Sequence, residues 1–132
     1  MKYILDTNIC IYIMKNKINV VDKYLENKHL GIAISVITFA ELQHGIFQSN
    51  NIEKNQENLA NFLAGVDVLN FNYPAAVEYG KICAYLYKRG TPIGPMDMLI
   101  GAHAKSTELI LVTNNIREFS RIENLCTENW AE

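Results

Sequence analysis

The chain of 132 residues is poor in cysteine and proline, with three of each. Cys10, Cys83 and Cys126 are odd in number and include no CxxC pair, so we expect neither disulfides nor a cysteine-bound zinc ion. Their mostly apolar neighbours predict reduced thiols in the core of a cytoplasmic protein. Internal repeats and Pro/Gly-rich linkers are also lacking, and the sequence therefore predicts a single domain over residues 1–132.

Long apolar runs are missing as well, since no window of the sequence approaches the length that spans a membrane. The amino-terminal residues 1–13 are interrupted by the polar triplet Asp6-Thr7-Asn8, which breaks the apolar core that a signal peptide needs. We therefore expect no membrane association and a cytoplasmic location.

The overall composition is that of a globular domain, with 49% hydrophobic and 20% charged residues. The net charge of -2 argues against nonspecific coating of nucleic acid. It does not exclude a nucleic-acid substrate, because bound divalent cations reverse the sign of an acidic pocket. The lysines form no run of five or more, which is typical of a solvated surface.

Apolar segments without polar alternation predict buried strands, and amphipathic segments predict the helices between them. We expect strands at residues 3–5, 30–34, 66–71 and 109–113, with a weak one near Leu125. We expect helices at residues 7–14, 19–27, 36–48, 52–63, 74–88, 97–105 and 117–119. This alternation indicates an α/β fold with a mainly parallel sheet that helices cover on both faces.

Three acids lie in apolar surroundings, where an ionised carboxylate is costly to bury without a partner. Asp6 ends the first strand, Glu41 interrupts an apolar helix, and Asp97 opens another. Asp6 also suits a helix N-cap, and Asp97 suits a first turn, where the helix dipole favours it by less than about 1 kcal/mol. Together the three acids are better explained by one shared cation, for which Mg²⁺ or Mn²⁺ is the best match to hard oxygen ligands.

Ligands of parallel sheets gather at the carboxyl ends of the strands. Asp6 lies at one such end, and Thr113, Asn114 and Asn115 lie at another, so we expect these two tips to be neighbours. Glu41 and His44 have the E-x-x-H spacing of di-iron sites, but the second copy that such sites require is absent. Phosphate-binding loops and a nucleophile elbow are absent too.

Four blocks of sequence carry a resemblance to a known family. They are YILDTN at 3–8, SVITFAEL at 35–42 with Gly45, GPMD at 94–97 with IGAHA at 100–104, and VTNN at 112–115 with Glu118-Phe119. In order and spacing they resemble the PIN domain, and more narrowly the VapC ribonuclease toxins of type II toxin-antitoxin modules. The resemblance implies a three-layer α/β/α fold, a homodimer, and a cognate VapB-type antitoxin.

The same resemblance implies an endoribonuclease that depends on Mg²⁺, with Mn²⁺ also supporting activity. Asp6, Glu41 and Asp97 would be its metal ligands and catalytic residues. The residues expected to orient waters, ligands or substrate are Thr7, Asn8, Thr113, Asn115 and Glu118. Many relatives carry a fourth acid where this chain has the uncharged Asn115, and Glu118 is the nearest substitute. The sequence therefore does not decide between one cation and two.

Relatives that share the loop before Asp97 are associated with cutting structured RNA, especially the anticodon stem-loop of initiator tRNA. The resemblance thus suggests a tRNA substrate. Two alternatives stay open from the residues alone: a PIN-like module that binds a protein without catalysis, and a structure-specific DNA nuclease.

Overall fold

A computed structural model describes all 132 residues and shows one five-stranded sheet in which every pair of neighbouring strands is parallel. The strand order is β3-β2-β1-β4-β5. The strands are β1 (Tyr3–Leu5), β2 (Ile32–Ser35), β3 (Asp67–Leu69), β4 (Ile110–Val112) and β5 (Thr127–Glu128). The helices are α1 (Thr7–Met14), α2 (Ile18–Asn27), η1 (Lys28–Leu30), α3 (Val36–Phe47), α4 (Ile52–Leu63), α5 (Tyr73–Lys88), α6 (Pro95–Thr107) and α7 (Ile116–Phe119).

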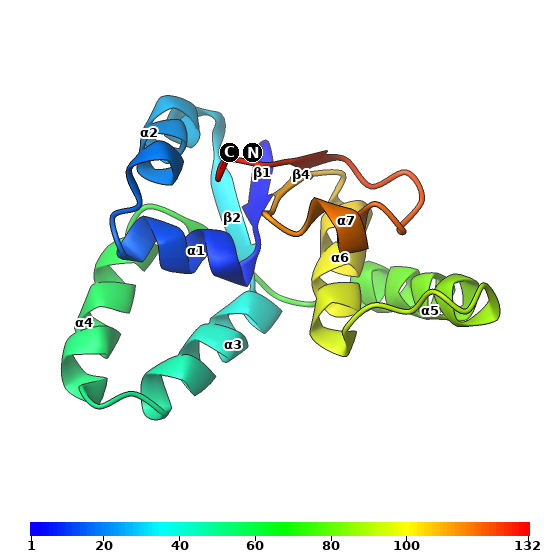
Figure 1. The fold of residues 1–132 in the computed structure, drawn as a ribbon, viewed down its shortest axis with the longest axis horizontal. Helices are drawn as coiled ribbons and strands as arrows, with labels where there is room; N and C mark the ends of the chain where they lie inside the picture. Colours follow the sequence, from blue (N-terminus) through cyan, green and yellow to red (C-terminus); the bar gives the residue numbers. More distant parts are fainter.

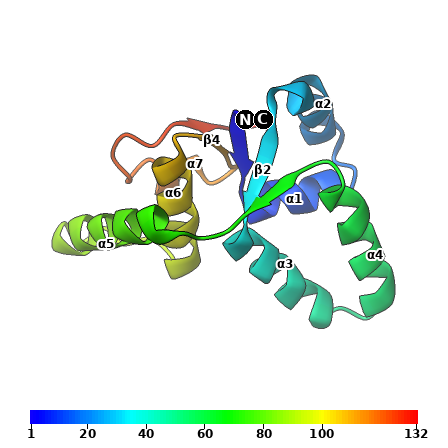
Figure 2. The same ribbon diagram turned by 180° about the vertical axis from the view of Figure 1, so that it is seen from behind.

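The sheet has a separate hydrophobic core on each face, as its strand sequences predict. Side chains alternate along a strand, so Tyr3 and Leu5 join a cluster with α1, α2 and α4 while Ile4 joins one with α5, α6 and α7. Figure 1 shows α1 and α2 on one side of the sheet and α5 and α6 on the other, and Figure 2 shows the same division from behind. The expected three-layer α/β/α fold is therefore confirmed.

Some expected boundaries were wrong around β2 and β3. The predicted strand at 30–34 begins later, because residues 28–30 form a 3₁₀ turn that ends at Gly31. Gly31 has a φ of 89°, and a Cβ there would lie 2.7 Å from the backbone Cα of Met1. The strand expected at 66–71 is only three residues long and partly exposed. The weak strand expected near Leu125 is present as a two-residue strand at 127–128.

The cysteines do not all belong to the core. Cys10 is fully buried as expected, but Cys83 is half-buried and Cys126 is exposed. Cys126 lies in the loop just before β5. Strand β5 pairs with β4 only from Thr127 onward, so the loop residues before it stay on the surface. None of the helices is both long enough and apolar enough to cross a bilayer.

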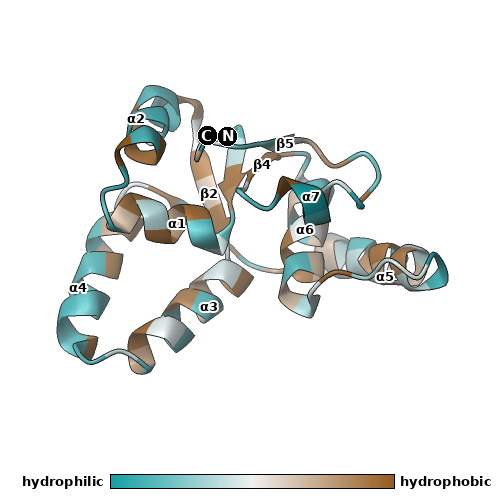
Figure 3. Ribbon diagram, in the orientation of Figure 1, coloured by the Kyte–Doolittle hydropathy of each residue, from teal (hydrophilic) through white to brown (hydrophobic).

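Helix α3 is less covered than its apolar sequence predicts. Only Thr38 and Leu42 are buried along it, and the side chain of Phe47 is 63% exposed. Figure 3 shows α3 running away from the sheet, where it pairs at its far end with the mainly hydrophilic α4. Glu41 is accordingly half-buried and lies at the wall of a cavity. The expectation of an internal carboxylate at this position was wrong.

Candidate active site

Asp6 lies at the carboxyl end of β1, the central strand, which has β2 on one side and β4 on the other. The strands that follow β2 and β4 in the chain, β3 and β5, lie on opposite edges of the sheet. The carboxyl end of β1 is therefore the switch point of strand order, where parallel sheets bind ligands. Asp6 is only 5% exposed. Its Oδ1 accepts the Ile9 N–H at 3.0 Å and so caps α1, while its Oδ2 accepts the Thr113 hydroxyl at 2.5 Å. Both carboxylate oxygens are thus held in place.

Glu41 is linked to the same region through the first residue of α1. The Thr7 hydroxyl donates a 2.5 Å hydrogen bond to Glu41 Oε1. Helix α3 starts directly after β2, where the Ser35 hydroxyl oxygen accepts the Ile37 N–H at 3.0 Å. Helices α1 and α3 therefore begin at the ends of the adjacent strands β1 and β2. The hydrogen bond from Thr7 links the start of α1 to Glu41, which lies in the second turn of α3.

Asp97 comes from the other side of the sheet, in the first turn of α6. Pro95 occupies the start of this helix, and the half-buried carboxylate of Asp97 lies within its first turn. Burial raises the pKa of Asp97, and repulsion from Glu41 and Glu118 raises it further. Asp97 is thus close enough to both glutamates to interact with their charges.

The pKa of Asp6 is raised to about 6, mainly because burial disfavours its charged form. The hydrogen bonds from Thr113 and Ile9 oppose this shift, whereas the charges of Asp97 and Glu41 add to it. The Asp6 charge in turn helps to raise the pKa of the buried thiol of Cys10, after burial itself. Electrostatically, Asp6, Glu41 and Asp97 form one group of interacting acids.

The group carries negative charge, and no lysine or arginine lies within ion-pair distance of it. The two ion pairs of the structure both involve Glu78, which belongs to α5, so none of the three acids is neutralised by lysine or arginine. At the same time, no three acidic, histidine or cysteine side chains are close enough together to enclose one metal ion. The arrangement suits a hard cation that keeps several water ligands, as Mg²⁺ does, rather than a closed protein cage.

The other predicted residues differ in their positions. The Asn115 N–H donates to the Thr113 hydroxyl oxygen at 2.9 Å, which places the half-buried Asn115 beside the residue that holds Asp6. Glu118, on α7, lies near enough to Asp97 to affect its pKa. Asn8, by contrast, is exposed on α1, and no hydrogen bond ties its side chain to the acids.

Comparison with known proteins agrees with this architecture. The model of the PIN domain family matches residues 3–125. The chain is 41% identical, over 99% of both sequences, to the tRNA(fMet)-specific endonuclease VapC of Shigella flexneri. It belongs to the PIN domain family, as a VapC protein. It is also 42% identical to ribonuclease VapC2 of Rickettsia felis over 98% of both sequences.

The solved structure of a relative has the same fold as this VapC protein. The crystal structure of VapBC2 from Rickettsia felis bound to a DNA fragment from its promoter superimposes with a TM-score of 0.94 at 40% identity. The match covers 98% of this VapC chain and 99% of the other. Structures of VapBC proteins are thus among the structural relatives of this PIN domain.

One polar pair of the VapC domain was not anticipated from its sequence. His103 Nδ1 and the Ser35 hydroxyl are joined by a 2.7 Å hydrogen bond, although the residues are 68 positions apart. His103 is 1% exposed, burial lowers its pKa, and its ring lies edge-on to Phe71 at 5.4 Å. Nothing in the local spacing of the sequence relates Ser35 to His103. The pair joins the start of α3 to α6.

A cavity of about 360 Å³ opens beside Glu41 of this PIN domain, between α1, α3 and α4. Glu41 lines it together with the apolar Ile11 and Ile46 and with Lys15. The cavity therefore gives Glu41 an open approach from one side, with a lysine at its wall.

Proposed function

We propose that this VapC protein is a toxin that hydrolyses RNA phosphodiester bonds, with Asp6, Glu41 and Asp97 acting on a divalent cation. The observation that carries the proposal is the position of Asp6 at the switch point of the sheet, buried and coupled in charge to the other two acids. Such a concentration of unneutralised negative charge is costly in a purely structural site. A cation and a bound phosphate together offset that cost.

The donor set favours Mg²⁺ or Mn²⁺, because the three groups that interact through their charges are all carboxylates. When bound, such an ion lowers the pKa of a coordinated water and neutralises charge on the phosphate. Asp6 and Asp97 would hold the ion directly. Glu41, which lines the open cavity, would orient a water molecule. The hydrogen bond from Thr7 would hold the Glu41 carboxylate in position.

The neighbouring residues would keep these carboxylates in position. Thr113 holds one oxygen of Asp6, and Asn115 holds Thr113 through its N–H, so the side chain of Asn115 is free to bind a water or a phosphate oxygen. Glu118 approaches Asp97 from α7 and adds negative charge to that side of the site. Asn8 would meet the substrate at the rim rather than the ion.

The substrate we propose is tRNA(fMet), cut in its anticodon stem-loop. The support for this tRNA is the relative of Shigella flexneri, which is named a tRNA(fMet)-specific endonuclease and aligns with this chain over 99% of both sequences. Cleavage of this tRNA would stop translation initiation and arrest growth of the cell in which the protein acts, in the cytoplasm.

The partner we propose is a VapB-type antitoxin, by likeness to the VapBC complex of Rickettsia felis. The exposed Phe47 on α3 and Tyr73 on α5, which is 85% exposed, provide apolar surface for such contacts and for a homodimer. An antitoxin would keep the protein inactive until the antitoxin is degraded or released.

The test is to incubate the purified protein and Mg²⁺ with the anticodon stem-loop as RNA and as its 2′-deoxy counterpart. We expect cleavage of the RNA and not of the DNA, with the cut mapped by sequencing fragment ends. Efficient cutting of the DNA would instead make the protein a deoxyribonuclease. No cutting of any RNA, while expression still arrests growth independently of the three acids, would favour a binding module.

A further inference from the structure

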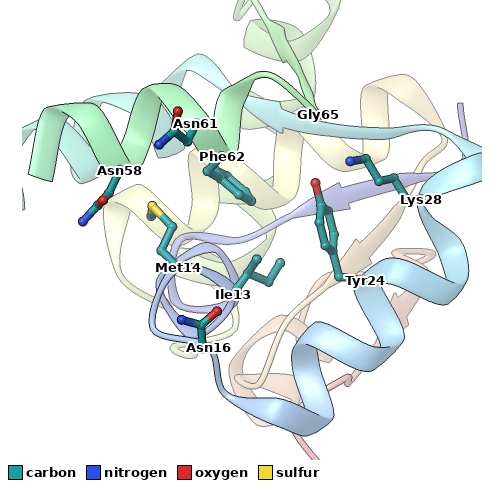
Figure 4. Close-up of a pocket in the computed structure, with 9 residues that line it drawn as sticks. All are labelled: Ile13, Met14, Asn16, Tyr24, Lys28, Asn58, Asn61, Phe62 and Gly65. Atoms are coloured by element: carbon teal, nitrogen blue, oxygen red, sulfur yellow. The ribbon is translucent and has the colours of Figure 1, made fainter.

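The largest cavity near the sheet lies away from the acids, between α1, α2 and α4, and has a volume of about 440 Å³ (Figure 4). This is within the range of ligand pockets, roughly 300 to 1,000 Å³. We call it the Lys28 pocket. Its polar wall consists of Lys28, the phenol of Tyr24, and the amides of Asn16, Asn58 and Asn61.

Lys28 and Tyr24 converge at one end of the Lys28 pocket. Figure 4 shows both side chains pointing toward Gly65. The Lys28 ammonium and the Tyr24 hydroxyl each lie 2.9 Å from the position that a Cβ on residue 65 would take. The ammonium also lies 5.7 Å from the centre of the Tyr24 ring. The absence of a side chain at Gly65 therefore makes room for both polar groups.

The charge of this pocket is positive and not offset. No Asp or Glu lines the pocket, and no carboxylate lies within ion-pair distance of the Lys28 ammonium. An ammonium, a phenol and three amides supply hydrogen-bond donors around one space. Such a set binds an anion with additional polar groups around it, and lysine, asparagine and tyrosine are common contacts of phosphates and sugars.

The Lys28 pocket adjoins the cavity that Glu41 lines. Met14 and Asn58 line both spaces, and Lys15 lines the cavity that Glu41 also lines. An RNA strand with one phosphate near Glu41 would therefore pass Lys15 on its way to Lys28, through two neighbouring cavities.

We propose that the Lys28 pocket holds a nucleotide of the RNA substrate through its backbone phosphate, at some distance along the strand from the bond that is cut. The proposal rests on the proposed ribonuclease function. An RNA strand fits better than a docked peptide helix, because a helix needs slots for apolar side chains, whereas donors dominate this pocket. Lys28 is then a positioning residue that fixes the register of the strand.

The test measures binding of fluorescein-labelled tRNA(fMet) to the protein in an Asp97→Asn background, by anisotropy over a range of salt concentrations. Lys28→Gln should weaken binding roughly tenfold, because a charge-assisted contact is lost. It should also lower the slope of log K against log [salt] by about 0.7 to 1. Lys23→Gln removes an exposed charge from α2, the helix that precedes Lys28, and is the matched control, with little change expected.

Gly65→Ala gives a second variant that keeps the net charge. A methyl group would displace the Lys28 ammonium and the Tyr24 hydroxyl, so tRNA binding should weaken while the circular dichroism spectrum stays unchanged. Equal effects of Lys28→Gln and Lys23→Gln would overturn the proposal. So would weaker binding of the antitoxin, but not of tRNA, in the Lys28→Gln protein. A complete failure of the Asp97→Asn protein to bind RNA would instead refute the proposed function, and this inference with it.

Discussion

The Thr113 hydroxyl donates a 2.5 Å hydrogen bond to Oδ2 of Asp6, and this bond ties together the carboxyl ends of the adjacent strands β4 and β1. Because the bond favours the ionised form of Asp6, it opposes the rise in pKa that burial causes. Thr113 thus helps to keep Asp6 ionised.

Removal of this hydroxyl should weaken catalysis through Asp6. We expect Thr113→Val to raise the pKa of Asp6 further and to lower the cleavage rate roughly 10- to 100-fold, as losses of residues that support metal ligands do. The acidic limb of the pH–rate profile should move to higher pH. Thr113→Ser keeps the hydroxyl and should restore both the rate and the profile. A slower Val variant with an unmoved acidic limb would show that Thr113 has only a structural role.

The stability of the metal-free protein should depend on pH through Asp6. Its pKa is about 6 in the folded state against 3.8 for the ordinary carboxyl, so the folded state binds the proton more tightly. The free energy of unfolding should therefore fall as the pH rises from about 4 through 6, by on the order of 3 kcal/mol from this residue. Chemical denaturation of the wild type and of Asp6→Asn across this range measures the difference between their slopes.

Divalent cations should offset the loss of stability that ionisation of Asp6 causes above pH 6, because they bind the ionised form of Asp6 in the folded state. We expect added Mg²⁺ or Mn²⁺ to raise the melting temperature of the wild type at pH 7.5 and to have much less effect on Asp6→Asn. An equal rise in both proteins would contradict a cation site at Asp6.

The hydrogen bond between Ser35 and His103 should contribute to stability. Ser35→Ala removes both the N-cap of α3 and the only side-chain partner of the buried His103, which should cost roughly 1 to 3 kcal/mol in the free energy of unfolding. Ser120→Ala is the control, since its exposed hydroxyl contacts only the Arg117 carbonyl and its loss should change stability by less than about 0.5 kcal/mol. Similar values for the two variants would refute the role of the pair.

Two glycines should respond in opposite directions to alanine. Gly31→Ala places a Cβ 2.7 Å from the Met1 backbone at a φ of 89°, so we expect a loss of about 1 to 3 kcal/mol. Gly80→Ala adds a methyl group to the interior of α5, where nothing lies within 4 Å, and should stabilise by up to about 1 kcal/mol. Thermal denaturation of both variants checks these signs.

The sequence predicted the architecture well because the strand segments around Ile4 and Leu111 are apolar on both faces, which only a covered parallel sheet explains. It also predicted that the strand ends at Asp6 and Thr113 are neighbours, because ligands of parallel sheets gather at the carboxyl ends of the strands. The exact start of β2 was missed, since the turn before it depends on the contact of Gly31 with Met1.

Contacts between distant segments were harder to predict. The bond from Ser35 to His103 joins residues 68 positions apart, and no local period encodes it. The burial of Glu41 was overestimated, because an apolar helix sequence does not distinguish a core helix from one whose surface awaits a partner. The roles of Asp6, Glu41 and Asp97 in catalysis stay predictions that activity must test.

The central claim is tested most directly by the rate of tRNA(fMet) cleavage in the presence of Mg²⁺ by the wild type, Asp6→Asn, Glu41→Gln, Asp97→Asn and the control Asp22→Asn. Asp22 is an exposed acid on α2 outside both cavities. We predict that each of the three site variants loses at least about a hundredfold in rate, that Asp22→Asn stays within about twofold, and that EDTA abolishes cleavage. Cleavage by Asp6→Asn and Asp97→Asn at the wild-type rate would contradict the account.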